Sequence, residues 1–264
     1  MDLSLNGKTA LVTGSTAGIG FAIARGLLEQ GAAVWVNGRT SDRVQRAIAA
    51  LRHDFPRAEI AGIAADLATA EGAAQTTGTL PAADILINNL GIYQLKPFAE
   101  ITDQDWIGLF EVNVLSGIRL TRHYVTGMRA RNWGRILFIS SESATNIPAD
   151  MIHYGMTKAA QLAVSRGVAE IVAGTNITVN AVLPGPTRSE GVEAFVEQMA
   201  KAKGITAEQA EAQFFQTERP TSLLKRFARV EEVANLVVYL SSPAASATTG
   251  AAVRVDGGVV QSIL

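Results

Sequence analysis

The 264-residue sequence contains no cysteine. This absence excludes disulfide bridges, thiolate nucleophiles and cysteine-based zinc sites, and it is compatible with a reducing compartment. Histidine is scarce as well, and His53, His123 and His153 lie too far apart in the chain to form a local metal motif. We therefore expect no metal site and no cysteine chemistry.

The sequence also lacks an excess of either charge and any long apolar run. Lys and Arg number 23 against 24 for Asp and Glu, so no strong field attracts nucleic acid or an acidic membrane. No stretch approaches the roughly 18 apolar residues that span a bilayer, and the amino terminus has no basic segment followed by an apolar one. We expect a cytoplasmic protein without nucleic-acid or membrane partners.

Short apolar runs alternate with longer helical patterns along the whole chain, and no repeat or linker divides it. Runs without strict alternation are typical of parallel strands that are covered on both faces. The order predicts one α/β domain over 1–264, a doubly wound, Rossmann-like, parallel seven-stranded sheet with helices on both faces. The predicted strands are 8–14, 32–38, 58–66, 83–89, 134–140, 176–185 and 251–258, and the predicted helices are 18–30, 41–53, 69–78, 103–131, 154–173 and 231–241.

The segment 186–228 interrupts this alternation with one or two short helices. An excursion at the carboxyl end of a strand is the place where a ligand lid lies, so we call 186–228 the lid segment. Its apolar residues either form the wall of a substrate pocket, which predicts a substrate with an apolar part, or pack on the core or a neighbouring subunit. These residues are Val192, Phe195, Val196, Met199, Phe214, Phe215, Leu223 and Leu224.

The loop "TGSTAGIG" at 13–20 follows the first predicted strand and opens the first predicted helix. Glycines such as Gly14, Gly18 and Gly20 permit a tight turn and a close approach of pyrophosphate, whose charge the free N–H groups of a helix start attract. Structural turns also collect glycine, so the loop alone is a weak signal. Its place between a buried strand and a helix favours dinucleotide binding.

Three motifs occur in order: Thr13-Gly14-x3-Gly18-Ile19-Gly20, "NNLG" at 88–91, and Tyr154-x3-Lys158. With them the chain resembles the short-chain dehydrogenase/reductase family over nearly its whole length. The resemblance implies an oxidoreductase that transfers a hydride between a nicotinamide cofactor and a carbonyl or secondary alcohol. The family usually has alanine where this chain has Leu90. The implied cofactor contacts are Gly14, Ser15, Thr16, Gly18, Ile19, Gly20, Asp66, Leu67, Asn89, Gly91, Tyr154, Lys158, Pro184, Gly185 and Thr187.

Two of these contacts have alternatives. Asp66 is also placed to be the N-cap of the next helix, and Ser189 competes with Thr187 for the nicotinamide carboxamide. The end of the second strand, "VNGRTSDR", carries Arg39 and no acid at 37–39. A guanidinium grips a 2'-phosphate, whereas an acid binds the free ribose, so NADP(H) is favoured over NAD(H). Asp42 nearby, and Ala17 where such enzymes often carry a second basic residue, weigh against this choice.

Tyr154 and Lys158 lie one turn apart on the same face of a predicted helix. In isolation such a pair indicates a partly exposed tyrosine beside a solvated lysine. With the other motifs, we interpret Tyr154 as the acid/base group and Lys158 as the ammonium that lowers its pKa. The resemblance adds that Lys158 binds the nicotinamide ribose. We expect His153, the neighbouring residue, to point away from this site.

Ser141 ends the fifth strand, where a hydroxyl can donate to a substrate carbonyl oxygen, with Ser140 and Ser143 as rivals. The resemblance favours Ser141. It also implies that Asn113 distorts its helix and positions a water linked to Lys158, which completes a catalytic set of Asn113, Ser141, Tyr154 and Lys158.

Family members commonly form dimers and tetramers through two long helices and the last strand, so the resemblance implies a homotetramer. The alternative function is a catalytically silent dinucleotide-binding sensor or scaffold on the same fold, and an epimerase or dehydratase is a weaker option. Substrate, direction and stereochemistry stay open at this point.

Overall fold

A computed structural model describes residues 1–263 of the chain. Its main sheet has seven parallel strands in the order β3-β2-β1-β4-β5-β6-β9. The predicted doubly wound sheet is therefore confirmed, and each predicted strand overlaps an observed one. The strands are β1 (Thr9–Val12), β2 (Ala33–Gly38), β3 (Ile60–Ala64), β4 (Ile85–Asn88), β5 (Gly134–Ile139), β6 (Ile177–Pro184) and β9 (Ala252–Val255).

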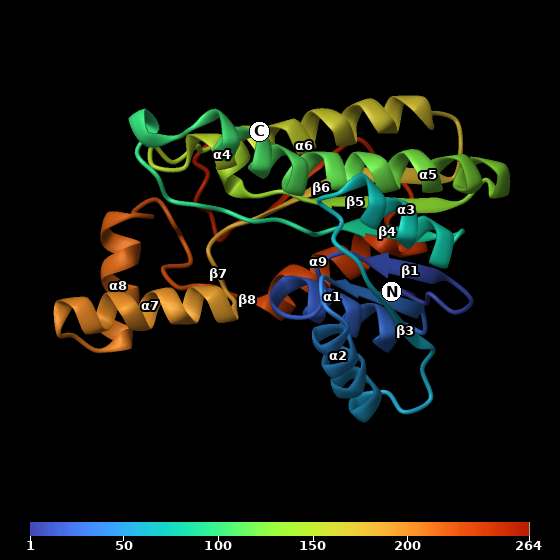
Figure 1. Ribbon diagram of the computed structural model, residues 1–264, viewed down its shortest axis with the longest axis horizontal. Coiled ribbons are helices and arrows are strands. Elements are labelled where there is room, and N and C mark those ends of the chain that lie inside the picture. The colour runs from blue at the N-terminus through green and yellow to red at the C-terminus, as the bar shows by residue number, and fades with distance from the viewer. Residues whose placement is uncertain (264) are drawn as a thin grey trace.

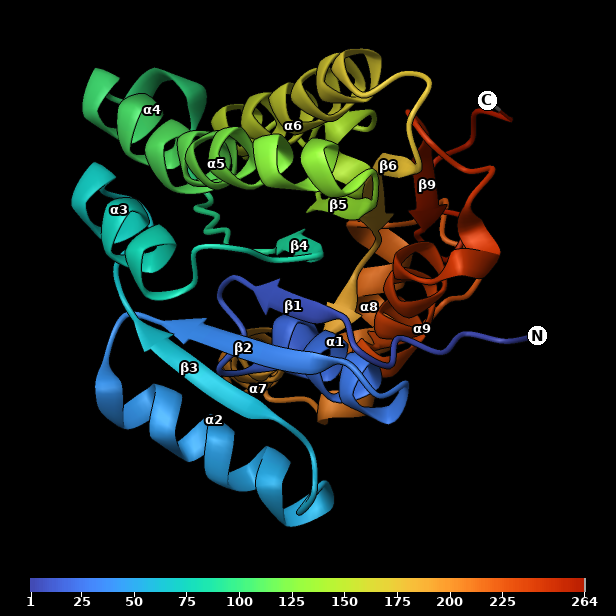
Figure 2. The ribbon, with the colours of Figure 1, turned by 90° about the vertical axis from the view of Figure 1, so that its right-hand side faces the viewer.

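Helices cover both faces of this sheet (Figures 1 and 2). One face packs on α1 (Gly18–Glu29), α2 (Ser41–Asp54) and α9 (Val230–Ser241), and the other on α3 (Ala70–Thr79), α5 (Ser116–Arg131) and α6 (Ile152–Ile171). Successive residues of β1 point to opposite faces, so Val12 lies in the first core and Leu11 in the second. Burial of both faces explains why the strands read as continuous apolar runs.

The predicted helix 103–131 is not one regular helix. It consists of α4 (Asp103–Phe110), a π-helical turn η2 (Glu111–Leu115) and α5. Asn113 lies inside the π turn and is buried. An inserted π turn exposes backbone groups to side chains and is common at functional sites, which agrees with the implied distortion at this asparagine.

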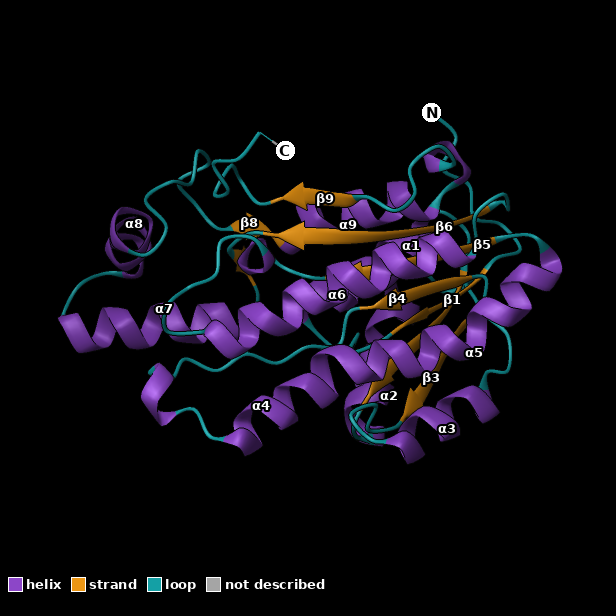
Figure 3. Ribbon diagram, turned by 90° about the horizontal axis from the view of Figure 1, so that it is seen from above, coloured by secondary structure: helices purple, strands orange, loops and turns teal. Residues whose placement is uncertain are grey.

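The lid segment contains β7 (Thr187–Arg188), α7 (Glu190–Lys203), α8 (Ala207–Thr217) and β8 (Ala228–Arg229). The two short strands pair in parallel at its base, and an ion pair joins Arg188 to Glu211 of α8. Figure 3 shows α7 and α8 beyond the end of the sheet to which β6 points. The segment has a small core of its own, formed by Val196, Ala200, Ala210, Phe215 and Phe227.

Three short 3-10 turns complete the described elements: η1 (Phe98–Glu100), η3 (Glu142–Ala144) and η4 (Pro243–Ala245). Among residues 1–263, no helix is both long and apolar enough to cross a membrane.

Candidate active site

A cavity of about 600 Å³ lies at the carboxyl ends of β4, β5 and β6, between the glycine loop, α6 and the lid segment. We call it the active-site cavity. The carboxyl edge of a parallel sheet is the usual ligand site of such folds, because the loops that leave the strands converge there. Its lining includes Gly20, Asn89, Gly91, Ser141, Tyr154, Lys158, Pro184, Gly185 and Thr187, all predicted from the sequence.

The glycine loop has the backbone geometry that its sequence predicts. Gly14 and Gly18 have φ of 59° and 57°, in the left-handed region that favours glycine. A Cβ on Gly20 would lie 2.5 Å from Asn89 Nδ2, so a side chain there would displace the loop. Whereas Thr40 and Thr69 cap α2 and α3, α1 begins after Ala17 with no side-chain cap.

Ala17, Ile19 and Gly20 line the cavity, so the uncapped start of α1 opens onto it. Unpaired N–H groups and the positive end of the helix dipole attract an anion such as a pyrophosphate. The residues present therefore fit a dinucleotide cofactor at this place.

Ser15 makes its hydrogen bonds inside the protein, and its predicted cofactor contact stays a prediction. Its hydroxyl donates to the Val12 carbonyl at 2.7 Å and accepts the Asn37 N–H at 2.9 Å, while its own N–H donates to the Asn37 carbonyl at 2.9 Å. Both of its donors are thus used inside the protein, and Ser15 holds the loop against β2. Thr16, its neighbour, packs its methyl group at the end of β2, beside Gly38.

Asn89 supports the loop from the other side. Its amide donates to the carbonyls of Thr13 and Gly14 at 2.9 and 3.1 Å, and Thr13 Oγ1 accepts the N–H groups of Asn89 and Leu90. The larger Leu90 side chain packs against the second core and beside Gly14. The departure from alanine is thus accommodated by packing.

Arg39 is exposed at the end of β2, and no hydrogen bond or ion pair holds it within residues 1–263. Asp42, the competing acid, forms an ion pair with Arg46 at 2.6 Å on α2. Asn37 is buried, and its amide donates to the carbonyls of Ile63 and Ala65. Arg39 is therefore the group at this strand end that is free to meet a phosphate.

The end of β3 corrects one alternative, that Asp66 is an N-cap. Thr69 is the N-cap of α3, and Asp66 instead accepts the Ala68 N–H at 3.1 Å in a local turn while remaining exposed. Leu67 is fully buried in the second core. The contacts of Asp66 and Leu67 with an adenine ring stay predictions.

Tyr154 and Lys158 project from α6 to the cavity, as predicted. Lys158 Nζ donates to the Ile139 carbonyl at 2.9 Å and to Gln161 Oε1 at 3.2 Å, and it lies 5.6 Å from the centre of the Tyr154 ring. The Tyr154 ring packs edge-on against Tyr93 at 6.2 Å. A Cβ on Gly91 would lie 3.3 Å from Lys158 Nζ, so a glycine keeps this space open.

The electrostatics of the pair differ from the expectation. Burial lowers the pKa of Lys158 to about 7, and burial raises the pKa of Tyr154 above its ordinary value. The neighbouring Ser141 hydroxyl and the charge of Arg219 act on the Tyr154 pKa in the opposite direction. Lys158 Nζ donates to the Ile139 carbonyl and the Gln161 amide. Burial, and not the Lys158 ammonium, is therefore the main influence on the pKa of Tyr154.

Ser141 and its rivals Ser140 and Ser143 all line the cavity, and each donates its hydroxyl proton inside the protein. The Ser140 hydroxyl donates to the Lys158 carbonyl at 2.9 Å, and the Ser143 hydroxyl donates to Glu142 at 2.9 Å. Ser141 Oγ donates to Glu142 Oε2 at 2.5 Å, and Ser141 and Tyr154 both line the cavity. The sequence analysis missed Glu142, although an acid directly after a reactive serine is a visible signal.

Asn113 is held tightly in the π turn. Its side chain accepts the Ile92 N–H at 2.8 Å and donates to the Ile92 carbonyl at 2.9 Å and to Thr157 Oγ1 at 3.0 Å. Its main-chain carbonyl accepts Gln161 Nε2 at 2.6 Å. Gln161 thus links the Asn113 carbonyl to Lys158 Nζ. The water that the resemblance implies beside Asn113 stays a prediction. Gln161 stands three residues after Lys158 on the same helical face, and this spacing was the signal that the sequence analysis overlooked.

The turn after β6 carries the remaining predicted contacts. A Cβ on Gly185 would lie 2.4 Å from the Asp256 carbonyl oxygen, so only glycine fits. Thr187 Oγ1 donates to the Gly185 carbonyl at 2.9 Å and keeps its lone pairs available to an amide N–H. Ser189 lines the cavity as well, so both alternatives for the carboxamide lie within it.

The lid residues divide into three groups. Val192, Phe195, Met199 and Phe214 line the cavity. Val196 and Phe215 belong to the core of the lid segment instead, and Leu223 and Leu224 are exposed residues beside Gly258 and Gly257. Half of the predicted apolar wall is therefore present. His153 is buried against Trp106, 5.8 Å between ring centres, and lies outside the cavity lining, as expected.

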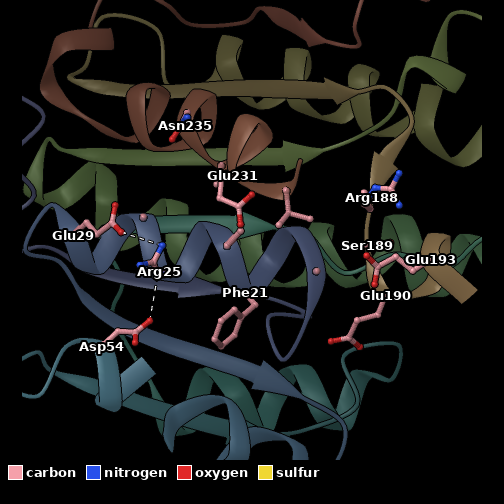
Figure 4. A pocket seen from close by; sticks show the side chains of 15 residues that line it. Phe21, Arg25, Glu29, Asp54, Arg188, Ser189, Glu190, Glu193, Glu231 and Asn235 are labelled. Carbon is pink, nitrogen blue, oxygen red and sulfur yellow. Dashed lines mark hydrogen bonds and ion pairs between the residues drawn. The ribbon is translucent and has the colours of Figure 1, made fainter. Parts of the chain in front are cut away.

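A second cavity of about 410 Å³ lies between α1, α9 and the base of the lid segment, and we call it the α1–α9 cavity. Figure 4 shows Arg25 there between Glu29 and Asp54, at 3.4 and 3.3 Å. No group of His, Asp and Glu within residues 1–263 is arranged to hold a metal ion.

Comparison with known proteins agrees with this geometry. Residues 8–200 match the family model described as short chain dehydrogenase. The chain is 47% identical over 263 residues to the uncharacterized oxidoreductase YvaG of Bacillus subtilis, with 100% of both chains covered. It is 34% identical to D-beta-hydroxybutyrate dehydrogenase of Cupriavidus necator, covering 97% of this chain and 99% of that protein.

Among solved structures, the chain is similar to L-sorbose reductase from Gluconobacter frateurii complexed with NADPH and L-sorbose. The TM-score is 0.94 at 33% identity, with 100% of both chains covered. The family model, the full-length relatives and the fold agree, and the chain therefore belongs to the short-chain dehydrogenase/reductase family and is an NAD(P)-dependent oxidoreductase.

Proposed function

We propose that the protein is an NADP(H)-preferring carbonyl reductase or alcohol dehydrogenase in which Tyr154 moves the substrate proton. The observation that carries this proposal is the meeting of Ser141, Tyr154 and Lys158 at one end of a cavity whose other wall is the uncapped glycine loop. The nicotinamide cofactor, when bound, supplies or accepts the hydride.

Tyr154 gives its phenolic proton to a carbonyl oxygen during reduction and takes the hydroxyl proton during oxidation. Ser141, whose hydroxyl donates to Glu142, lines the same cavity as the phenol and acts on its pKa. Lys158 has a pKa of about 7, well below the raised pKa of Tyr154, so the ammonium readily returns a proton to the phenolate that carbonyl reduction leaves behind. Gln161 and Asn113 hold the Lys158 ammonium in its position.

Arg39 supports the cofactor preference. It is a cation without a partner at the end of β2, close to the start of α2, where Thr40 is the N-cap. A guanidinium and a helix start both favour a 2'-phosphate. The NADPH bound to the similar L-sorbose reductase is consistent with this preference.

The lid segment forms the substrate side of the cavity. Phe195, Met199 and Phe214 provide apolar surface opposite Tyr154, so the substrate has an apolar part beside its carbonyl or hydroxyl group. We also propose a homotetramer, in keeping with the exposed apolar residues Ile107 of α4 and Ile171 of α6.

Kinetics with the Tyr154→Phe variant test the catalytic assignment. Native protein is first screened for NADPH and NADH oxidation with aromatic, aliphatic, sugar and thioester carbonyl compounds. Loss of the phenolic proton lowers kcat by roughly 1,000-fold, within the range for a general acid, while NADPH binding measured by fluorescence persists.

Tyr93→Phe is the matched control, because it removes a neighbouring hydroxyl in the same cavity. Its kcat changes only a few-fold, about the worth of a single ordinary hydrogen bond. Full activity of Tyr154→Phe would refute the assignment. Nucleotide binding by the native protein without turnover of any carbonyl would favour the sensor or scaffold.

A further inference from the structure

Glu142 is a buried carboxylate directly after the reactive serine. It is 4% exposed, lines the active-site cavity and belongs to the short turn η3. An ion is costly to bury unless hydrogen bonds and an opposite charge compensate it. The hydrogen-bond partners of Glu142 therefore explain how a carboxylate is accommodated at this buried position.

Four donors surround this carboxylate. Oε2 accepts Ser141 Oγ at 2.5 Å, the Ser143 N–H at 2.7 Å and Ser143 Oγ at 2.9 Å, and Oε1 accepts Arg219 Nε at 3.0 Å. A backbone N–H and a guanidinium only donate, and Arg219 supplies the opposite charge that a buried carboxylate needs. The Ser141 proton consequently points at Glu142, and Ser141 presents lone pairs to the cavity instead of the donor that we expected.

Arg219 reaches the same place from the lid segment. Its side chain is 15% exposed, and its Nη1 donates to the Glu218 carbonyl at 2.9 Å. Among the described residues that line the cavity, Arg219 and Lys158 are the cations, and Glu142, Asp150 and Glu218 are the acids. Lys158 is already bonded to Ile139 and Gln161.

A substrate carboxylate in this cavity would therefore meet three acids and two cations that already have partners. Like charges brought together in a partly desolvated pocket select strongly against a ligand. A neutral ketone or alcohol meets no such penalty, and its apolar part contacts Phe195 and Met199 of the lid.

We propose that Glu142 determines the substrate class: by engaging Arg219 and the Ser141 proton, it makes the cavity accept neutral carbonyl compounds and reject keto acids. This inference rests on the proposed carbonyl reductase function and narrows it. Glu142 is a specificity-determining residue here. Its ion pair with Arg219 makes that guanidinium unavailable to a substrate anion.

The test compares a neutral ketone ester with the corresponding keto acid anion, methyl benzoylformate and benzoylformate, each with NADPH. The native protein favours the ester. In Glu142→Gln the loss of the negative charge frees Arg219, and the ester-to-acid ratio of kcat/KM falls at least about tenfold through a gain for the acid. The intrinsic reactivity of the two ketones cancels in this comparison between variants.

Arg219→Gln is the second variant. In the double variant with Glu142→Gln, the gain in kcat/KM for benzoylformate is abolished. In the Arg219→Gln single variant, the ester is still favoured over the acid. Native preference for benzoylformate, or the same ratio in Glu142→Gln, overturns the inference, and so does selective loss of acid turnover in Arg219→Gln, since that result makes Arg219 a carboxylate receptor.

Melting curves and NADPH binding verify that each variant is folded. If neither ketone is reduced, the same ratio is taken from their inhibition constants against the best carbonyl substrate of the screen. If the native protein reduces neutral ketones but Glu142→Gln leaves the ester-to-acid ratio unchanged, only the role of Glu142 is refuted. If the native protein reduces no carbonyl compound, the proposed function itself is refuted.

Discussion

Two cavities of the same molecule contain charged side chains that differ in exposure to solvent. In the active-site cavity, Lys158 is 4% exposed and Glu142 is likewise buried. In the α1–α9 cavity, the side chains of Arg25 and Glu29 are each 45% exposed. Water screens the second set, whereas burial shifts the pKa of Lys158 to about 7. Burial, not the presence of charged residues, gives one cavity its chemistry.

Lys158→Met removes the charged group whose pKa burial shifts in the active-site cavity. We expect kcat/KM to fall by roughly 1,000-fold, because the variant loses both the proton partner of Tyr154 and a cofactor contact. Steady-state kinetics with the best carbonyl substrate measure it. A loss below tenfold would show that the buried ammonium contributes little to the reaction.

The same variant has a signature in stability. Native Lys158 has a pKa of about 7 against an ordinary 10.5, so the unfolded chain binds more protons between these values. The Lys158 contribution to the free energy of unfolding therefore rises as pH increases from about 7 towards 10.5, and it falls again as pH returns to about 7. Denaturant unfolding of both proteins across this range gives a difference that grows with pH.

Arg39→Asp tests an exposed charge that we propose binds the 2'-phosphate of the cofactor. We expect the NADPH-to-NADH ratio of kcat/KM to fall by about 100-fold, since a guanidinium-phosphate contact becomes a repulsion. Arg57→Asp, an equal charge change at an exposed position in the turn before β3, is the control and leaves the ratio unchanged. Equal effects of both variants would reduce the result to a general change of surface charge.

Arg25→Ala in the α1–α9 cavity is expected to have the smallest effect. Its ion pairs with Glu29 and Asp54 are about half exposed, so the free energy of unfolding changes by at most about 1 kcal/mol. Turnover and cofactor preference stay at their native values. A tenfold loss of kcat/KM would mean that this cavity takes part in function and would break the contrast with the first.

Most of the fold was predictable because it follows from local patterns. The strands around Leu11 and Val36 are apolar on both faces, and that pattern indicates a parallel sheet between helices. Gly14 and Gly18 indicated a left-handed turn before a helix, and both have positive φ. Tyr154 and Lys158 were predicted to share a helical face, and both line the cavity.

Other features depend on which segments meet. Asn113 indicated an irregular helix, yet its link to Lys158 through Gln161 exists only because α6 packs beside η2. The sequence did not show that Leu67 packs in the second core or that the Ser15 hydroxyl bonds to Val12 and Asn37. Such outcomes depend on long-range contacts, which sequence spacing does not encode.

The sequence by itself determined the order of strands and helices, the glycine turn and the shared face of Tyr154 and Lys158, because each arises from residues near one another in the chain. Only the tertiary structure decided the pKa directions and the partners of Glu142. The Arg219 guanidinium that pairs with Glu142 stands 77 residues away in sequence, and the burial that shifts Lys158 comes from the whole fold closing around it.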